Sequence, residues 1–221
     1  MDNKNHRDSS GRTLGDYPRP SVAVDAAVLT VDPAVGLSVL QVRRTGGRGW
    51  ALPGTFLHAG ETLADAVARA LADKANVTGL CPRQLHVFDD PERDDRGWVL
   101  SVAHVAVVPP DRLTSRLVAT TRLVPVHAPG RLIYDHADII ALSVEDVRTR
   151  YEASPDPDRL LGEEFTLRDL RLVHEGVAGS ALQRDTFRRS MESQLVATGA
   201  TTAGGRGRPA ELFRRRVNLE S

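Results

Sequence analysis

The sequence predicts an α/β sandwich with a mixed β-sheet, followed by a small helical domain that ends in a hairpin. Three observations support this prediction. β-rich runs alternate with helical patterns through residues 20–153. A stretch rich in Pro, Asp and Gly follows from about residue 154 and indicates a domain boundary. Residues 154–221 then contain two short amphipathic helical patterns and an end rich in Arg and Gly.

The expected elements of the larger domain follow the chain in order. Residues 1–19 are polar and without periodicity, which predicts a flexible arm. The runs SVAVDAAVLTV and LSVLQVRR predict two strands, joined into a hairpin by the turn DPAVG. QLHVF and WVLSVAHVAVVP predict further strands, and the second is long and apolar, as a buried central strand should be. A strand near 123–126 and a helix over about 137–151 complete the domain.

Charge is unevenly distributed in this chain of 221 residues, although its formal net charge is zero. Residues 166–221 contain ten arginines and six acidic residues, so they carry +4 and the remainder carries −4. A basic C-terminal domain favours a nucleic acid or another polyanion as its partner. A solvated charged surface is the alternative explanation.

The cysteine content and the hydropathy indicate a cytoplasmic protein that does not cross a membrane. Cys81 is the single cysteine, which excludes an intramolecular disulfide and a thiolate metal cluster, and we expect it to be buried or half-buried. No apolar run reaches the ~18 residues of a membrane helix. The N-terminus lacks the apolar core of a signal peptide.

The stretch WALPGTFLHAGETLADAVARALADKANVTGL (residues 50–80) carries the most specific motif. Thr62 and Asp65 form a capping-box pattern, which predicts a helix over 62–75. This loop and helix resemble the Nudix box, G-x5-E-x7-R-E-U-x-E-E-x-G-U, where U is an aliphatic residue. The positions that match the pattern are Glu61, Arg69, Leu71 and Val77. The positions that depart from it are Thr55 and Asn76, each in place of a glycine, and Ala70, Asp73 and Lys74, in place of the three helix acids.

The departures decide what chemistry the box can perform. Positions 70, 73 and 74 share one helix face, and the resemblance implies that this face holds Mg²⁺ against a diphosphate in active Nudix enzymes. Ala70 offers no oxygen ligand, and Lys74 places a positive charge where the cation would lie. The sequence therefore predicts no bound metal, no catalytic residues and weak or no hydrolysis. The alternative is an active hydrolase of ADP-ribose or another nucleoside diphosphate derivative, with Glu61 and Asp73 as the remaining ligands.

Basic and aromatic residues around the box favour a site for a nucleotide-type ligand. Guanidinium groups suit bidentate contacts with a diphosphate, an aromatic ring can stack on a base, and Lys74 can replace the charge of the metal. Singly, each arginine is better explained as an exposed residue, and Trp50 is equally well explained as a core aromatic. As a cluster, the candidate ligand-binding residues are Arg43, Arg44, Trp50, Phe56, Glu61, Lys74, Arg93 and Arg96.

Two histidines have simpler explanations than catalysis. His104 lies in the middle of an apolar strand and is expected to be a hydrogen-bonded core residue. His136, in the string YDHAD, either caps a helix or lines the pocket.

The C-terminal residues have the pattern of a DNA-binding unit. Thr166 with Asp169 predicts the start of one helix. A second helix is expected over about 183–194, with Phe187 and Met191 on its buried side. Arginines then lie on the exposed side, as in a recognition helix, and a basic hairpin tip is expected around residues 204–208. The candidate DNA-binding residues are Arg184, Thr186, Arg188, Arg189, Arg206 and Arg208.

Residues 20–217 together resemble the Nudix-related transcriptional regulators of bacterial NAD metabolism. The strings that carry the resemblance include FDDPERDDRGWVLSVAHVAVVP, YDHADII, EEFTLRDLRLVHEGVAG and GRPAELFRRR. It implies a Nudix-like domain over 20–153 that binds ADP-ribose or a related nucleotide, and a winged helix-turn-helix over 154–221. It also implies a homodimer that binds a palindromic double-stranded DNA operator and represses transcription, with no required cofactor. A third hypothesis is an RNA-binding module, but no aromatic-rich stacking motif supports it.

Overall fold

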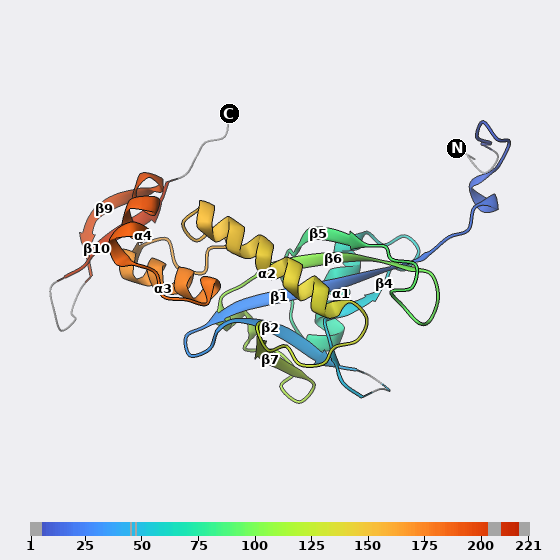
Figure 1. Ribbon diagram of the computed structural model, residues 1–221, viewed down its shortest axis with the longest axis horizontal. Coiled ribbons are helices and arrows are strands. Elements are labelled where there is room, and N and C mark those ends of the chain that lie inside the picture. Colours follow the sequence, from blue (N-terminus) through green and yellow to red (C-terminus); the bar gives the residue numbers. More distant parts are fainter. Residues whose placement is uncertain (1–5, 45, 47, 203–208, 217–221) are drawn as a thin grey trace.

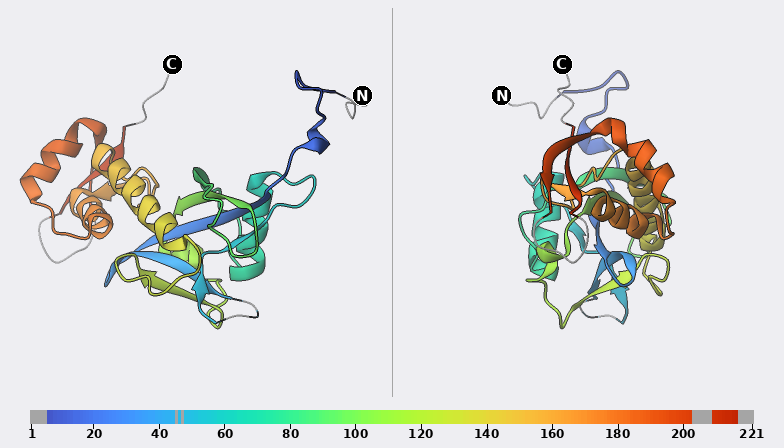
Figure 2. Two further views of the ribbon diagram at one scale, coloured as in Figure 1. Left: turned by 45° about the vertical axis from the view of Figure 1, so that its right-hand side comes forward. Right: turned by 90° about the vertical axis from the view of Figure 1, so that its left-hand side faces the viewer.

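The chain folds into an α/β unit and a smaller C-terminal unit (Figure 1) in the computed structural model, which describes residues 6–44, 46, 48–202 and 209–216. Helix α2 (His136–Ala153) extends from the first unit toward the second, as Figure 2 also shows. The predicted fold class is confirmed. The predicted strands and helices are present within a few residues of their expected bounds.

A mixed sheet forms the centre of the larger unit. Its strands follow the order β3-β2-β1-β6-β5, with β4 paired to β1 and β7 paired to β2. β1 and β2 form the expected antiparallel hairpin, whereas β1 and β6 run parallel, with Ala23 opposite Ser101. The strands are β1 (Ser21–Asp32), β2 (Gly36–Arg43), β3 (Trp50–Ala51), β4 (Gly54–Phe56), β5 (Arg83–Phe88), β6 (Val99–Val107) and β7 (Thr121–Pro125).

Helices cover both faces of this sheet and so bury β1 on both sides. Val24 and Val28 pack with α1 (Leu63–Ala75) on one face. Ala27 and Leu29 point to the other face and pack with α2. Side chains of a strand alternate between the two faces of a sheet, so a continuous apolar run is required in a strand covered by helices on both sides.

The start of α1 is fixed by the predicted capping box. The Thr62 hydroxyl accepts a hydrogen bond from the Asp65 backbone N–H at 3.2 Å, and the Asp65 carboxylate accepts one from the Thr62 N–H at 3.0 Å. Asn76 ends the helix in the left-handed conformation, with φ of 53°. From the last turn of this helix, Lys74 donates to the backbone carbonyl of Gly54.

The C-terminal unit has its own core. Two helices, α3 (Leu167–Ala178) and α4 (Arg184–Met191), pack on a three-stranded sheet in the order β8-β10-β9. Its strands are β8 (Phe165–Thr166), β9 (Leu195–Thr201) and β10 (Glu211–Arg215). The buried side chains that join them are Phe165, Leu170, Phe187, Met191, Leu195 and Phe213. The terminal hairpin is therefore confirmed, and its expected tip around residues 204–208 lies outside the described residues.

The two units pack directly against each other. A Cβ atom on Gly176 of α3 would lie only 2.4 Å from Val31 Cγ1 of β1, so the approach requires glycine. Val177 joins the core that α2 shares with the sheet. Between the units, the fully buried Asp156 accepts hydrogen bonds from the backbone N–H groups of Leu160 and Leu161 and pairs with Arg215 of β10.

Three details differ from the sequence-based expectations. Cys81 is exposed rather than buried or half-buried, because it lies in the loop between α1 and β5. The N-terminal arm contains a short 3-10 helix (Leu14–Asp16), in which the Asp16 carboxylate accepts the Thr13 N–H at 2.7 Å. The helix expected over 183–194 ends at Met191, and a 3-10 turn (Glu192–Gln194) follows it.

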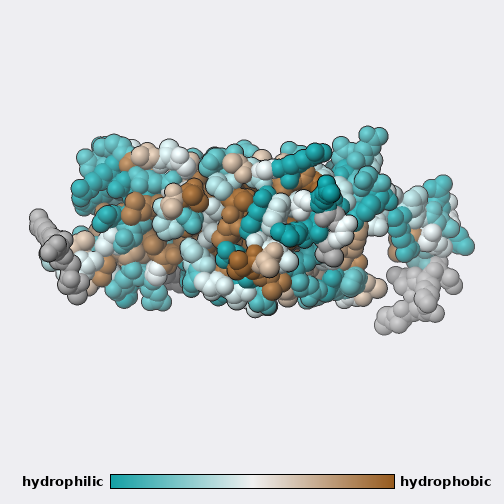
Figure 3. Space-filling view, turned by 90° about the horizontal axis from the view of Figure 1, so that it is seen from below, coloured by the Kyte–Doolittle hydropathy of each residue, from teal (hydrophilic) through white to brown (hydrophobic). Residues whose placement is uncertain are grey.

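The surface is mixed in character. Hydrophobic residues reach the surface over the middle of the face seen from below, between the more hydrophilic ends of the molecule (Figure 3). Within the described residues, no helix is both long enough and apolar enough to span a bilayer.

Candidate functional site

A polar cavity of about 280 Å³ opens where the loop before α1, the loop before β6 and the first turn of α2 meet. Of the predicted ligand-binding residues, six line it: Arg43, Arg44, Phe56, Lys74, Arg93 and Arg96. Asp25, Asp94 and Tyr134, which the sequence did not single out, also line it, as does His136, for which the sequence left a place in the pocket open. The folded chain thus brings together residues that lie more than a hundred positions apart in the sequence.

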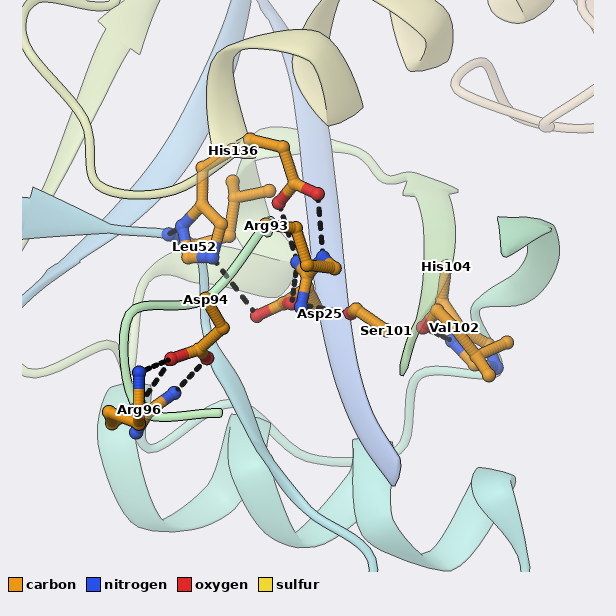
Figure 4. A network of polar contacts seen from close by, with 10 residues as sticks. Asp25, Leu52, Arg93, Asp94, Arg96, Ser101, Val102, His104 and His136 are labelled. Atoms are coloured by element: carbon orange, nitrogen blue, oxygen red, sulfur yellow. Dashed lines mark hydrogen bonds and ion pairs between the residues drawn. The ribbon is translucent and has the colours of Figure 1, made fainter. Parts of the chain in front are cut away.

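Asp25 of β1 is the buried acid at the base of this cavity (Figure 4). Its carboxylate accepts the Ser101 hydroxyl at 2.6 Å and lies 3.3 Å from His136 Nε2. Because the Leu52 N–H donates to His136 Nδ1 at 3.0 Å, the proton of the neutral ring belongs on Nε2, facing Asp25. Burial raises the pKa of Asp25, but the bonds from His136 and Ser101 and the charge of Arg93 outweigh it and hold the pKa below its usual range.

Two arginines of the cavity are fixed by carboxylates. Arg93, whose side chain is 3% exposed, binds Asp135 through Nε at 2.7 Å and Nη2 at 2.5 Å. Arg96 binds Asp94 through Nε at 2.8 Å and Nη2 at 2.6 Å, and this pairing lowers the pKa of Asp94 (Figure 4). Bidentate pairs hold the planar guanidinium in one orientation, so both groups are pre-positioned.

Arg96 also lies between two aromatic rings. Its guanidinium carbon is 4.9 Å from the centre of the Phe56 ring and 5.1 Å from that of Tyr134. Both distances are within the range of cation–π attraction. Tyr134 has φ of 49°, in the left-handed region that bulky residues rarely adopt. The three successive residues Tyr134, Asp135 and His136, at the start of α2, therefore all contact the cavity or its arginines.

The α1 face does not fit a Mg²⁺ ion. Ala70 is buried and offers no ligand, and Asp73 is exposed. Lys74 turns its ammonium group to the backbone carbonyl of Gly54, and desolvation lowers its pKa. Across the described residues, no group of three or more His, Cys, Asp or Glu is placed to hold a metal ion. The face instead gives the cavity a fixed organic cation.

Arg43 and Arg44 differ from the other arginines of the cavity. Neither takes part in the salt bridges found among the described residues, whereas Arg93 and Arg96 do. Around the cavity, five cationic side chains (Arg43, Arg44, Arg93, Arg96 and Lys74) face three carboxylates (Asp25, Asp94 and Asp135). The excess of two positive charges matches the charge of a diphosphate diester.

Trp50 and Glu61 do not line the cavity. The Trp50 ring lies under Arg43 and Arg122, 5.5 and 4.3 Å from their guanidinium carbons. Glu61 forms a salt bridge with Arg69 at 2.6 Å, which lowers its pKa to about 2, and Arg69 also donates to the Phe56 carbonyl at 2.9 Å. Glu61 therefore fastens the loop to α1, and its assignment to ligand binding stays a prediction.

Sequence signals for the missed residues were present but weak. Asp25 is a charged residue inside the apolar run SVAVDAAVLTV, which indicates a special role for a buried acid. His136 lines the cavity, whereas the N-cap of α2 is Asp135, so the second of its two alternatives holds. His104 is a buried histidine with Nδ1 2.9 Å from the Val102 carbonyl, as expected for a satisfied core residue.

The second candidate surface is the outer side of α4. Its predicted DNA-binding residues Arg184, Thr186, Arg188 and Arg189 are all exposed, while Phe187 and Met191 are buried. Arg188 pairs with Glu192 at 3.2 Å, and both side chains are 54% exposed, so solvent screens that pair. Arg206 and Arg208 lie outside the described residues.

Comparisons with known proteins identify the two domains that carry these surfaces. Residues 20–143 match the family model described as NUDIX domain, and residues 158–215 match the one described as NrtR DNA-binding winged helix domain. The ADPR responsive transcriptional repressor NtrR of Acinetobacter baylyi is 30% identical over 212 residues, which are 90% of this chain and 83% of that protein.

Solved structures show the same arrangement of domains. The crystal structure of Shewanella oneidensis NrtR complexed with a 27mer DNA matches 88% of this chain and 93% of its own, with a TM-score of 0.72 and 31% identity. The NUDIX domain of that protein, solved with ADP ribose, matches 62% of this chain and 95% of its own, with a TM-score of 0.53 and 26% identity. The chain is thus a Nudix domain followed by a winged-helix domain, and it belongs to the NrtR family of transcriptional regulators.

Proposed function

We propose that this protein is a cytoplasmic transcriptional repressor that binds a palindromic operator as a homodimer and senses ADP-ribose or a related NAD metabolite. The observation that carries the proposal is Lys74, whose ammonium group lies in the cavity on the helix face where a Nudix hydrolase needs carboxylates. A site that holds a diphosphate with an organic cation, and lacks the metal that would cleave it, suits a sensor.

Effector binding is assigned to the polar cavity. Arg43, Arg44 and Lys74 supply charge for the diphosphate, and the fixed Arg93 and Arg96 shape the walls around it. The relatives named for ADP-ribose support this choice of effector. The assigned boundaries are an arm over 1–19, an effector domain over 20–153 and a DNA-binding domain over 154–221.

DNA binding is assigned to α4, with Arg184, Thr186, Arg188 and Arg189 toward the major groove and Arg206 and Arg208 toward the backbone. Two such helices of a dimer reach successive major grooves only if the half-sites lie ~34 Å apart. ADP-ribose relieves repression only if it binds the DNA-free arrangement of the dimer more tightly than the DNA-bound one.

A titration of the DNA upstream of the protein's own operon tests the proposal. We expect binding in the nanomolar range that weakens steeply with salt and is reversed by ADP-ribose. A random duplex of equal length is the control. Equal affinity for both duplexes at moderate salt would contradict the assignment as a sequence-specific regulator.

Hydrolysis is the second function to test, because a Nudix domain is present. We expect weak or no hydrolysis of the diphosphate bond of ADP-ribose with Mg²⁺ or Mn²⁺, since Ala70 and Lys74 leave Asp73 as the one carboxylate of that face. Robust turnover that Asp73→Ala abolishes would show that the protein is an enzyme instead.

A further inference from the structure

A second cavity, of about 440 Å³, opens at the junction of the two units, where the end of α2 faces α3 and α4. It shares no lining residue with the Asp25 cavity and is the larger of the two. Its volume is typical of sites for small organic molecules. Because its walls come from both units, a molecule bound there contacts the effector domain and the helix assigned to DNA at once.

One wall of this junction cavity is aromatic. The ring centres of Tyr151 and His174 lie 5.0 Å apart, and those of His174 and Phe187 also lie 5.0 Å apart, both at steep angles. Val177 and Met191 extend the apolar surface. Such a wall favours a planar ring, which can contact it face-on or edge-on.

His174 gives this wall a hydrogen-bond donor. The Asp156 backbone N–H lies 3.3 Å from His174 Nε2 and donates to it, so the proton of the neutral ring is on Nδ1. Burial lowers the pKa of His174 to about 4, which keeps the ring neutral near pH 7. Among the hydrogen bonds of the described residues, none has His174 Nδ1 as its donor.

The rim carries one positive and one negative side chain. Arg148 and Glu152 lie one helical turn apart on α2, both exposed, and no ion pair joins them. Arg148 donates through Nε to the Val177 carbonyl at 3.1 Å. A carboxamide can accept from the arginine and donate to the glutamate, whereas a carboxylate is repelled by Glu152 and an ammonium group by Arg148.

We propose that the junction cavity binds a small aromatic carboxamide, with its ring against Tyr151, His174 and Phe187 and its amide group between Arg148 and Glu152. The ligand bridges α2 and α4, so its occupancy favours the arrangement of the two units in which the cavity is formed.

Calorimetric titration of the full chain with benzamide, benzoate and cyclohexanecarboxamide tests the proposal. We expect benzamide to bind at least tenfold more tightly than either of the other two compounds. Benzoate lacks the amide group that can donate to Glu152, and cyclohexanecarboxamide lacks the aromatic ring. No benzamide binding at concentrations on the order of 10 mM, or equal binding of all three, would overturn it. ADP-ribose is absent from this experiment, so its outcome is independent of the effector assigned to the Asp25 cavity.

Two variants locate the binding. Glu152→Gln should strengthen benzoate binding about tenfold, because the repelling charge is removed, while Glu145→Gln on the same helix, away from the cavity, should leave it unchanged. Ala178→Phe should abolish benzamide binding by filling the cavity, with its melting temperature as the check on folding. Unchanged benzamide affinity in folded Ala178→Phe would place the site elsewhere and contradict the proposal.

Discussion

The Asp25 cavity and the exposed side of α4 both contain arginines, but Arg93 of the cavity and Arg188 of α4 are held in opposite states. In the cavity, Arg93 is 3% exposed and bonded twice to Asp135. On α4, Arg188 is 54% exposed, and its partner Glu192 is equally exposed. A buried, paired guanidinium keeps one geometry and suits a small ligand, whereas exposed guanidinium groups can adjust to a long polyanion at low cost. The two surfaces should therefore respond differently to the loss of one arginine.

The largest effect is expected inside the cavity. Arg93→Met should lower the free energy of unfolding by about 3 kcal/mol, because it leaves Asp135 and Asp25 without their shared cation in a buried site. Urea denaturation of the two proteins measures this difference. Arg131→Met, at an exposed position of the same unit, is the matched control and should change stability by less than about 0.5 kcal/mol. Equal stabilities of both variants would show that the buried pair does not support the fold.

The contrast between buried and exposed ionisable groups also applies to the junction cavity, where His174 is buried and neutral, and it predicts a pH dependence of stability. Its pKa falls from about 6.5 in the unfolded chain to about 4 in the folded one, so only the unfolded state takes up a proton between these values. The resulting stability is complete above pH 6.5 and decreases as the pH falls to 4, by about 3 kcal/mol.

Denaturation curves at several pH values test this prediction against His174→Gln. Burial also lowers the pKa of His104, which contributes in the same direction, so the informative quantity is the difference between wild type and variant. We expect the variant to show a flatter decline over this range. Parallel declines would mean that His174 is accessible to protons in the folded protein.

The sequence predicted more of the scaffold than of the cavity, for physical reasons. Periodic apolar residues and capping boxes such as Thr62–Asp65 are local, so the α1 and α3 starts and the β1–β2 hairpin could be read from a few neighbouring residues. The contact of Asp25 with His136 joins β1 to α2 across more than a hundred residues, and no local pattern encodes it. Tyr134 was missed for the same reason, and Cys81 was misplaced because cysteine composition does not identify a loop.

On the exposed side of α4, the expected effect is on binding rather than on folding. Arg188→Ala should weaken operator binding by roughly ten- to a hundredfold, the equivalent of ~1–3 kcal/mol, because one guanidinium contact with DNA is lost. The melting temperature should not change, since the Arg188–Glu192 pair is screened by solvent. Fluorescence anisotropy with the operator measures the affinity, and Arg131→Ala serves as the control. Unchanged affinity would mean that α4 is not the recognition helix.

The smallest of these effects concerns Lys74, the residue of the cavity on which the proposed sensor function rests. Lys74→Ala should weaken ADP-ribose binding about tenfold in calorimetry, since it removes one charged contact with the diphosphate. Operator binding without ADP-ribose should be unchanged, because the cavity lies away from α4. The concentration of ADP-ribose that releases DNA should therefore rise by the same factor as the dissociation constant. A Lys74→Ala protein that binds the operator more weakly in the absence of ADP-ribose would show instead that Lys74 supports the DNA-bound arrangement. The Asp25 cavity and the exposed side of α4 would then not be independent.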